Sequence, residues 1–316
     1  MKALYFDGKS LRLLKDYPHP HRKQGWSIVK VTYAGICGTD LQILEGYAGF
    51  KGVPGHEFVG IVSDSEDIEL IGKRVVGEIN VGCGRCSYCL SGLERHCPER
   101  RVLGIKELNG SFAEYLTLPT KNLHVIPDSL TDEEAVFVEP LAACYEILEQ
   151  IKLDPNSRIL VLGDGRMGVL VSQVISKIAP ETILAGRHEE KLRRIKALGV
   201  KTMHVEEVEG LFDLVVEVTG RPEGVAHALK HVKPRGTIIL KTTTATNPTI
   251  NLSKVVVNEV TILGSRCGRF RPAIHALSIG QIHVRSLIDG VYALEDWEEA
   301  FQKVKERNVF KILLKP

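Results

Sequence analysis

The chain has 316 residues, of which 44% are hydrophobic and 25% are charged, and its formal net charge is +2. This length favours two domains, and this composition excludes a disordered or fibrous chain. The near-neutral balance, with both signs interspersed, excludes the one-signed field of a protein that binds nucleic acid or a membrane surface, so small molecules are the expected partners.

The N-terminal stretch MKALYFDGKSLRLL is interrupted by charge every few residues. It therefore lacks the apolar segment of a signal peptide. No run in the sequence approaches the roughly 20 apolar residues that cross a bilayer. Seven cysteines without an export signal favour thiolates that hold metal over a disulfide framework, and a cytoplasmic location is expected.

The first third of the chain consists of short β-rich runs separated by Gly, Pro and charged residues. The runs are WSIVKVTYAGIC, EFVGIVSD, KRVVGEINV and SFAEYLTLP. This pattern predicts an antiparallel, irregular β domain. Cys37 in GICGTD and the pair His56 and Glu57 in PGHEFVG stand within it, and each is a weak metal signal when taken alone.

Four cysteines crowd into the run CGRCSYCLSGLERHC, namely Cys83, Cys86, Cys89 and Cys97. Four thiolates this close can surround one ion tetrahedrally at about 2.3 Å each, and the glycines among them let the backbone fold back. The spacing therefore predicts a structural zinc site. The alternatives are two disulfides, which the expected compartment disfavours, and a redox cysteine pair. Because a four-sulfur site has no open position, we expect it to hold a loop rather than to do chemistry.

From about Pro140 the pattern changes to apolar strands that alternate with amphipathic helical stretches. The strands are RILVLG, ETILAG, LFDLVVEVTG and GTIILKTTT, and EVTILGSRCG is expected to extend the same sheet. Alternation of this kind predicts βαβ units around a parallel sheet. Towards the C-terminus, RPAIHALSIG and DWEEAFQKVKE are expected to form helices and FKILLKP a closing strand.

The first βα unit contains the glycine-rich turn GDGRMG between its strand and its helix. Gly163 allows a tight turn, Gly165 lets a pyrophosphate approach the backbone, and Gly168 brings the helix close to the strand. The N–H groups at the helix N-terminus then favour the negative charge of a dinucleotide. The turn also contains Arg166, which either contacts a phosphate or lies in solvent, and Met167.

The residue that selects the coenzyme is expected about 20 residues further on, where an acid would bind the ribose 2′-OH of NAD. The chain has ILAGRHEEKL there, with no acid at the end of the strand. Gly186 leaves room, while Arg187, His188 and Lys191 offer positive charge to a 2′-phosphate. NADP is therefore the preferred coenzyme, with NAD as the alternative if Arg187 stacks on adenine instead.

Taken together, CGTD, GHEFVG, the four-cysteine loop, EPLAA and the glycine-rich turn occur in the order and spacing of the zinc-containing medium-chain dehydrogenases. Over essentially its whole length the chain resembles the alcohol and polyol dehydrogenases of that family, and EPL points to the sorbitol, threonine and sugar dehydrogenase branch. The resemblance implies a two-domain α/β fold with the active site between the domains. A GroES-like, partly β-barrel catalytic domain would take residues 1–143 and 267–316, and a Rossmann domain residues 144–266.

The resemblance also implies a second, catalytic zinc, with Cys37, His56 and Glu139 as protein ligands and Glu57 as an alternating ligand or nearby acid. Three protein ligands leave one position for a water or substrate oxygen, and the charge of the ion lowers the pKa of a bound alcohol. Asp40, three residues after the cysteine, would orient His56 through its other ring nitrogen.

Three further roles follow from the resemblance alone. Thr39 would take the alcohol proton as the first step of a relay, Thr219 in VEVTG would hold the nicotinamide ring, and Arg266 in GSRCGRF would lie near coenzyme and substrate. The alternatives are an ordinary turn hydroxyl for Thr39 and a carboxylate ion pair for Arg266. Gln42 stands where many relatives carry a histidine, so we expect the relay to end in water or in the coenzyme ribose.

The expected activity is reversible hydride transfer between a primary or secondary alcohol, including polyols and sugars, and NADP or NAD. By resemblance, a homodimer or homotetramer is expected. One rival is a zinc-ribbon interaction protein, which the absence of a basic stripe in the sequence disfavours. Two others are a coenzyme-binding protein that has lost catalysis and a zinc-free enone reductase, and the Cys37, His56 and Glu139 set disfavours both.

Overall fold

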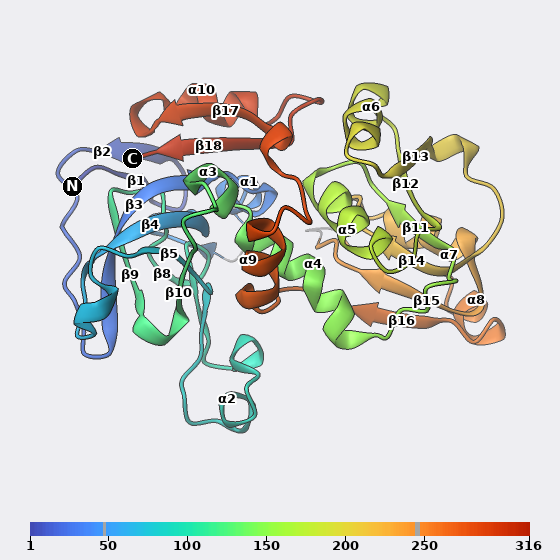
Figure 1. Ribbon diagram of the computed structural model, residues 1–316, viewed down its shortest axis with the longest axis horizontal. Coiled ribbons are helices and arrows are strands. Elements are labelled where there is room, and N and C mark those ends of the chain that lie inside the picture. Colours follow the sequence, from blue (N-terminus) through green and yellow to red (C-terminus); the bar gives the residue numbers. More distant parts are fainter. Residues whose placement is uncertain (47–48, 244–246) are drawn as a thin grey trace. The chain divides into compact units, whose positions relative to one another are not determined.

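The computed structural model describes residues 1–46, 49–243 and 247–316. The chain divides into two compact units (Figure 1). Unit 1 comprises Met1–Glu139 and Phe270–Pro316, and unit 2 comprises Pro140–Arg269. Helix α4 (Val138–Gln150) begins in the last residues of the first segment and continues into unit 2.

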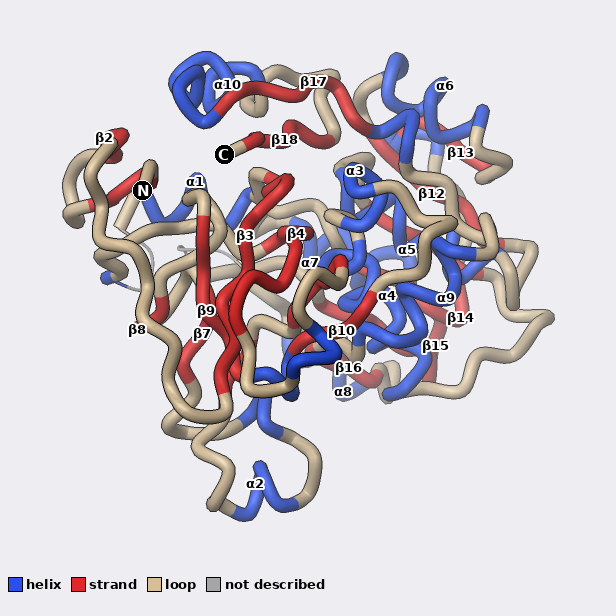
Figure 2. The backbone as a smooth tube through the Cα atoms, turned by 60° about the vertical axis from the view of Figure 1, so that its left-hand side comes forward, coloured by secondary structure: helices blue, strands red, loops and turns tan. Residues whose placement is uncertain are grey.

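The main sheet of unit 1 joins strands from both ends of the chain, and Figure 2 shows its long strands β3 and β4 side by side. Within the described residues its order is β10-β5-β4-β3-β18-β17, and β9 also pairs with β3. The pairings are antiparallel except that of β17 with β18, which is parallel. The bounds are β3 Trp26–Gly35, β4 Glu57–Asp64, β5 Arg74–Gly77, β9 Tyr115–Pro119, β10 Leu123–Val125, β17 Ile288–Ala293 and β18 Lys311–Lys315.

The core of unit 1 forms where the apolar side chains of these strands meet. Val29 of β3, Val59 of β4, Leu118 of β9 and Ile312 of β18 have no exposed surface. Burial of each such side chain stabilises the fold by roughly 1.5–3 kcal/mol. Strand β18 pairs with the end of β3, whose last residue, Gly35, stands two positions before Cys37.

The remaining elements of unit 1 are short. Strands β1 (Ala3–Phe6) and β2 (Leu11–Leu14) pair with each other. A small sheet of β6 (Asn80–Val81), β7 (Arg101–Leu103) and β8 (Glu107–Leu108) lies at the base of a loop that carries α2 (Ser87–Leu90) and projects from the unit in Figure 1. The other helices are α1 Gly38–Leu44, α3 Asp132–Ala135, α9 Phe270–Ser278 and α10 Trp297–Lys303.

Unit 2 is a parallel sheet with helices in its connections. Within the described residues its strand order is β13-β12-β11-β14-β15-β16, and every pairing is parallel. The strands are β11 Ile159–Leu162, β12 Thr182–Gly186, β13 Lys201–His204, β14 Phe212–Glu217, β15 Val232–Leu240 and β16 Thr261–Gly264. The helices are α5 Arg166–Ser176, α6 Glu189–Ala197, α7 Gly224–His231 and α8 Leu252–Val257. This order is that of a Rossmann domain, and it reverses between β11 and β14.

The predicted fold class, an irregular β domain with a parallel Rossmann domain, is confirmed. The sequence analysis did not predict β1, β2, β7, β8, β10, β13 or β17. Of these, β13 and β17 are only partly buried, so their residues do not show the apolar run or the alternation that marks a strand. Among the helices of the described residues, none combines the length and the apolar character needed to span a bilayer.

Candidate functional site

Three metal-ligating side chains meet at one end of β3 and β4 in unit 1. Cys37 follows β3 and precedes α1, while His56 stands directly before Glu57, the first residue of β4. Because β3 and β4 run antiparallel with Gly35 opposite Glu57, their pairing brings Cys37 beside the other two. One ligand atom of each of the three lies within 4.8 Å of the others. A thiol, an imidazole and a carboxylate form a donor set that zinc binds.

Asp40 of α1 contacts two residues of this cluster. Its Oδ2 accepts a hydrogen bond from the backbone N–H of Cys37 at 2.7 Å, and its Oδ1 lies 3.2 Å from Nδ1 of His56. The second contact has ion-pair distance but lacks the alignment of a regular hydrogen bond. Burial lowers the pKa of His56, but the charges of Asp40 and Cys37 outweigh it, so this pKa stands well above its ordinary value. With Nδ1 turned to Asp40, Nε2 of His56 is the ligand atom directed away from this carboxylate.

Lys311 of β18 is a neighbour of the cluster that the sequence analysis missed. Its side chain has no exposed surface, and its Nζ donates to Oε2 of the equally buried Glu57. The same Nζ lies 5.5 Å from the ring centroid of Phe137. A Cβ at Gly35 would come within 2.6 Å of Oε2 of Glu57 and 3.1 Å of this Nζ, so glycine leaves space for the pair. Lys311 therefore balances the charge of Glu57, which burial alone would disfavour.

The two other predicted residues of this site lie in different settings. Thr39 is close, with its Oγ1 3.8 Å from Sγ of Cys37. Glu139, in the first turn of α4, is half-buried. Over the described part of the chain, the convergent group contains Cys37, His56 and Glu57 and does not include Glu139. The ligand role of Glu139 stays a prediction.

In the loop between β6 and β7, the four cysteine sulfurs converge within 4.8 Å of one another. Sγ of Cys86 lies 3.5 Å from Sγ of Cys89 and 3.7 Å from Sγ of Cys97. These distances suit the edges of a sulfur tetrahedron around zinc and exceed the ~2.05 Å of a disulfide bond. Backbone N–H groups of Arg85 and Cys86 lower the pKa of Cys83 to about 6, whereas burial raises the pKa of Cys89 to about 12, so of these two thiols Cys83 more readily forms the thiolate that a metal requires. The loop therefore fits a structural zinc and not the disulfide alternative.

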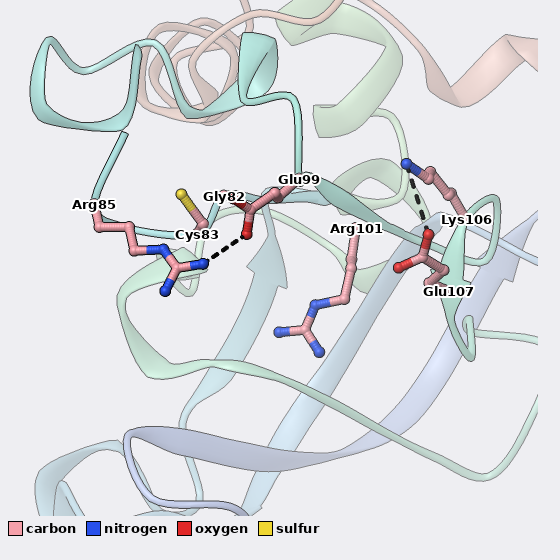
Figure 3. Close-up of a pocket in the computed structure, with 7 residues that line it drawn as sticks. All are labelled: Gly82, Cys83, Arg85, Glu99, Arg101, Lys106 and Glu107. Atoms are coloured by element: carbon pink, nitrogen blue, oxygen red, sulfur yellow. Dashed lines mark hydrogen bonds and ion pairs between the residues drawn. The ribbon is translucent and has the colours of Figure 1, made fainter. Parts of the chain in front are cut away.

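A pocket of about 580 Å³ borders this loop (Figure 3). In the close-up, Arg85 reaches Glu99 at 3.0 Å, and Lys106 reaches Glu107 at 3.6 Å. Arg101 stands between these pairs, and its guanidinium carbon lies 5.3 Å from the centroid of the Trp26 ring. Because Arg85 and Lys106 are each paired with an acid of the pocket lining and Arg101 lies against the Trp26 ring, we assign this pocket no ligand.

In unit 2 the glycine-rich turn joins β11 to α5. Gly163 has a φ of 125°, and a Cβ there would lie 2.7 Å from the carbonyl oxygen of Val218. A Cβ at Gly168 would lie 1.8 Å from the carbonyl oxygen of Gly163. At Gly165, by contrast, a Cβ would meet no atom within 4 Å. Two of the glycines are thus required by packing, and the third faces open space at the N-terminus of α5, where a pyrophosphate can approach.

A pocket of about 680 Å³ lies at the carboxyl ends of β11, β12 and β14, beside the point where the strand order reverses. This is the place where parallel α/β sheets bind dinucleotides. Acidic residues in its lining are Asp164 and Glu223. The basic residues in its lining are Arg187, His188, Lys191, Arg221, His227 and Lys230.

Of the four other predicted coenzyme residues, one lines this pocket and three do not. Thr219 lines it, and both its N–H and its hydroxyl donate to Oε1 of Glu217, at 2.8 and 2.6 Å. This carboxylate fixes the turn after β14, so Thr219 forms the pocket wall with its hydroxyl already engaged. Arg166 and Met167 open α5 and are half-buried outside the lining, and Arg266 is exposed after β16.

Comparison with known proteins covers both units. Residues 23–128 match the family model described as the alcohol dehydrogenase GroES-like domain, and residues 133–313 match the one described as the glucose dehydrogenase C-terminus. The chain is 30% identical to D-arabinitol dehydrogenase 1 of Uromyces fabae over 314 residues, covering 92% of this chain and 89% of that protein.

Two solved structures share the whole fold. One is a short chain alcohol dehydrogenase of Escherichia coli CFT073 complexed with NADH, with a TM-score of 0.91, 26% identity, and coverage of 100% of this chain and 99% of that one. The other, from Sinorhizobium meliloti 1021, is described as a zinc-binding dehydrogenase bound to NADP, with a TM-score of 0.88, 28% identity and coverage of 100% and 99%. These matches include both clusters of potential metal ligands and the dinucleotide crevice. We therefore conclude that the chain belongs to the zinc-containing medium-chain family of alcohol and polyol dehydrogenases.

Proposed function

We propose that this chain transfers a hydride reversibly between an alcohol carbon of a polyol or sugar and NADP, with one catalytic and one structural zinc. The observation that carries the proposal is the convergence of Cys37, His56 and Glu57 in a chain that also has a complete dinucleotide crevice. The polyol in the name of the Uromyces fabae relative supports this substrate class. A zinc-ribbon interaction protein is not favoured, because such a protein needs no dinucleotide crevice.

Zinc held by Cys37 and His56 would place positive charge at a substrate oxygen and so lower the pKa of the alcohol. The side chains around it keep the ligands in place. Asp40 holds the backbone of Cys37 and faces Nδ1 of His56, so both ligands stay oriented. Thr39, with its Oγ1 beside Sγ of Cys37, is proposed to accept the alcohol proton while its own hydroxyl proton passes to water or to the coenzyme ribose.

A carboxylate is proposed as the third protein ligand. Glu139 has this role by family resemblance, and Glu57 is the acid whose oxygen converges with Cys37 and His56. We propose that the two alternate at the metal, and that Lys311 neutralises Glu57 whenever this carboxylate is not a ligand.

NADP is the proposed coenzyme. The residue at the end of β12 is Gly186, and the basic side chains of the pocket outnumber its two acids. A pocket with this charge suits the additional phosphate of NADP. The two similar structures carry NADH in one case and NADP in the other, so they do not decide between the coenzymes.

Fluorescence titration of the purified protein with NADPH and NADH tests the coenzyme site without knowledge of the substrate. Tighter binding of NADPH is expected, and an NADP-linked screen of polyols, sugars and simple alcohols should then find turnover. Tighter binding of NADH would refute the NADP preference alone. Failure to bind either coenzyme would refute the proposed enzyme.

We also propose that the chain assembles into a homodimer or homotetramer through unit 2. Strand β16 ends the sheet order, and the neighbouring helix α8 exposes 65% of Leu252, 75% of Val256 and 79% of Val257. Exposed apolar patches beside an open sheet edge favour contact with a second copy. Light scattering should give at least twice the chain mass of 35.0 kDa, and a monomer mass would contradict the proposal.

A further inference from the structure

The acid that the sequence lacks at the end of β12 is supplied from the glycine-rich turn. Asp164 stands between Gly163 and Gly165 and is only 8% exposed. Its Oδ2 accepts hydrogen bonds from the backbone N–H groups of Arg187 at 2.7 Å and His188 at 2.8 Å. Nδ1 of His188 lies 3.0 Å from the same oxygen and 3.1 Å from Oδ1.

The carboxylate of Asp164 occupies the space that Gly186 leaves. A Cβ built on Gly186 would lie 2.4 Å from Cβ of Asp164, 2.5 Å from its Oδ2 and 2.7 Å from its Cγ. An acid at position 186 would therefore direct its side chain into the volume that the Asp164 side chain already fills. In a dinucleotide domain, an acid at this strand end binds the ribose 2′-OH. Here the negative charge comes instead from the glycine-rich turn after β11, the strand paired with β12.

Asp164 also occupies hydrogen-bond donors that a 2′-phosphate would otherwise use. The backbone N–H groups of Arg187 and His188 lie between β12 and α6, where a helix N-terminus attracts anions. A 2′-phosphate would find these donors already bonded to a carboxylate and would meet a like charge beside them. A neutral 2′-OH could instead donate to Oδ1 of Asp164, which has a second lone pair.

We propose that Asp164 is a coenzyme-specificity residue, whose carboxylate favours the ribose 2′-OH of NAD and opposes the 2′-phosphate of NADP. This inference rests on the proposed coenzyme site. Asp164 acts against Arg187, Lys191 and the other basic side chains of the pocket, and so limits the preference for NADP that those residues create.

The test compares the wild type with Asp164→Asn, which keeps the size of the side chain and removes its charge. Fluorescence titration with NADPH and NADH should show the ratio of Kd(NADH) to Kd(NADPH) rising about tenfold. The reason is that the variant removes the repulsion between the Asp164 carboxylate and the 2′-phosphate of NADPH. Competition with 2′,5′-ADP and 5′-ADP isolates the 2′ position and should show the same change. Thermal melting checks that the variant is folded, and Asp164→Ser provides a second, smaller replacement with the same expected direction.

Glu223→Gln is the charge-matched comparison, because it removes the other acidic charge from the pocket lining. Its change in the ratio should be much smaller than that of Asp164→Asn. An unchanged ratio in both Asp164 variants, a parallel loss of both coenzymes, or an equal effect of Glu223→Gln would overturn the inference. A wild type that binds neither coenzyme would instead refute the proposed function.

Discussion

Cys37 is the residue on which turnover is expected to depend most directly. Cys37→Ser replaces a soft thiolate with a poor zinc ligand, so alcohol oxidation should fall on the order of 10³-fold. Zinc content should fall from about two ions per chain to about one. NADPH affinity should stay within about twofold, because the coenzyme pocket lies in unit 2. Steady-state kinetics, metal analysis and the fluorescence titration measure these three quantities.

Cys144→Ser is a matched control for this substitution. Cys144 is buried in α4, where its thiol donates to the carbonyl oxygen of Pro140 at 3.3 Å, a bond that a serine hydroxyl can replace. Zinc content and turnover should therefore remain those of the wild type. Full activity in Cys37→Ser would refute the catalytic zinc assignment.

Lys311 is expected to stabilise the folded protein. Lys311→Met leaves the Glu57 carboxylate buried without its cation, which should lower the free energy of unfolding by about 3–5 kcal/mol. The double variant with Glu57→Gln should recover much of this loss, because no uncompensated charge stays buried. Urea denaturation measures both effects.

Lys303→Met is the comparison for a lysine in an exposed pair. Lys303 lies 2.7 Å from Glu306, and both side chains are solvent-accessible, so its loss should lower the free energy of unfolding far less than Lys311→Met does. If Lys311→Met were as mild as this variant, the buried pair would not contribute to stability as inferred.

At the scale of elements, the loop between β6 and β7 is expected to depend on the proposed structural zinc. Its neighbouring strands are only two or three residues long, so a zinc held by the four cysteines would supply the main constraint. Cys89→Ser should lower zinc content by about one ion per chain and make the segment 82–100 the first to be cut in limited proteolysis. Cleavage elsewhere, with this segment still resistant, would contradict a structural role for the metal.

The turn between β11 and α5 separates a packing role from a binding role. Gly168→Ala forces a methyl group against the carbonyl oxygen of Gly163 and should destabilise unit 2 by about 1–3 kcal/mol. Gly165→Ala meets no protein atom, so stability should change by less than about 0.5 kcal/mol. Because its methyl group would point into the space for the pyrophosphate, NADPH affinity should fall about tenfold or more.

Thermal melting and NADPH titration of the two glycine variants distinguish these effects. Each variant serves as the control for the other, since both add one methyl group to the same turn. A large stability loss in Gly165→Ala together with unchanged NADPH affinity would contradict the assignment of that open space to the coenzyme.

At the scale of the whole molecule, the two units should respond to different ligands. A saturating coenzyme stabilises the protein that binds it, by about 2.7 kcal/mol at a concentration one hundred times its Kd. In hydrogen exchange, NADPH should protect segments 162–168 and 185–191 of unit 2 most strongly. A zinc chelator should instead increase exchange in segment 83–97 of unit 1. If NADPH protected segment 83–97 as strongly as segment 162–168, the coenzyme site would be wrongly placed.

The sequence alone determined the features whose signals are local. The four cysteines lie within one short run, and the glycine-rich turn stands directly between a strand and a helix. The alternation of apolar strands with amphipathic helices likewise predicted the parallel sheet of unit 2. In each case the residues that define the feature are neighbours along the chain, so their spacing alone restricts the possible geometry.

Only the tertiary structure decided which distant residues meet. Lys311 is 254 positions from Glu57, and in the sequence it is one lysine among apolar residues of a closing strand. Asp164 is 23 positions from Arg187, and its carboxylate reaches the strand end because Gly186 has no side chain. The pairing of β3 with β4 placed Cys37 beside His56 and Glu57 but left Glu139 outside the convergent group among the described residues. Such contacts depend on strand register and on the space between elements, which spacing along the chain does not determine.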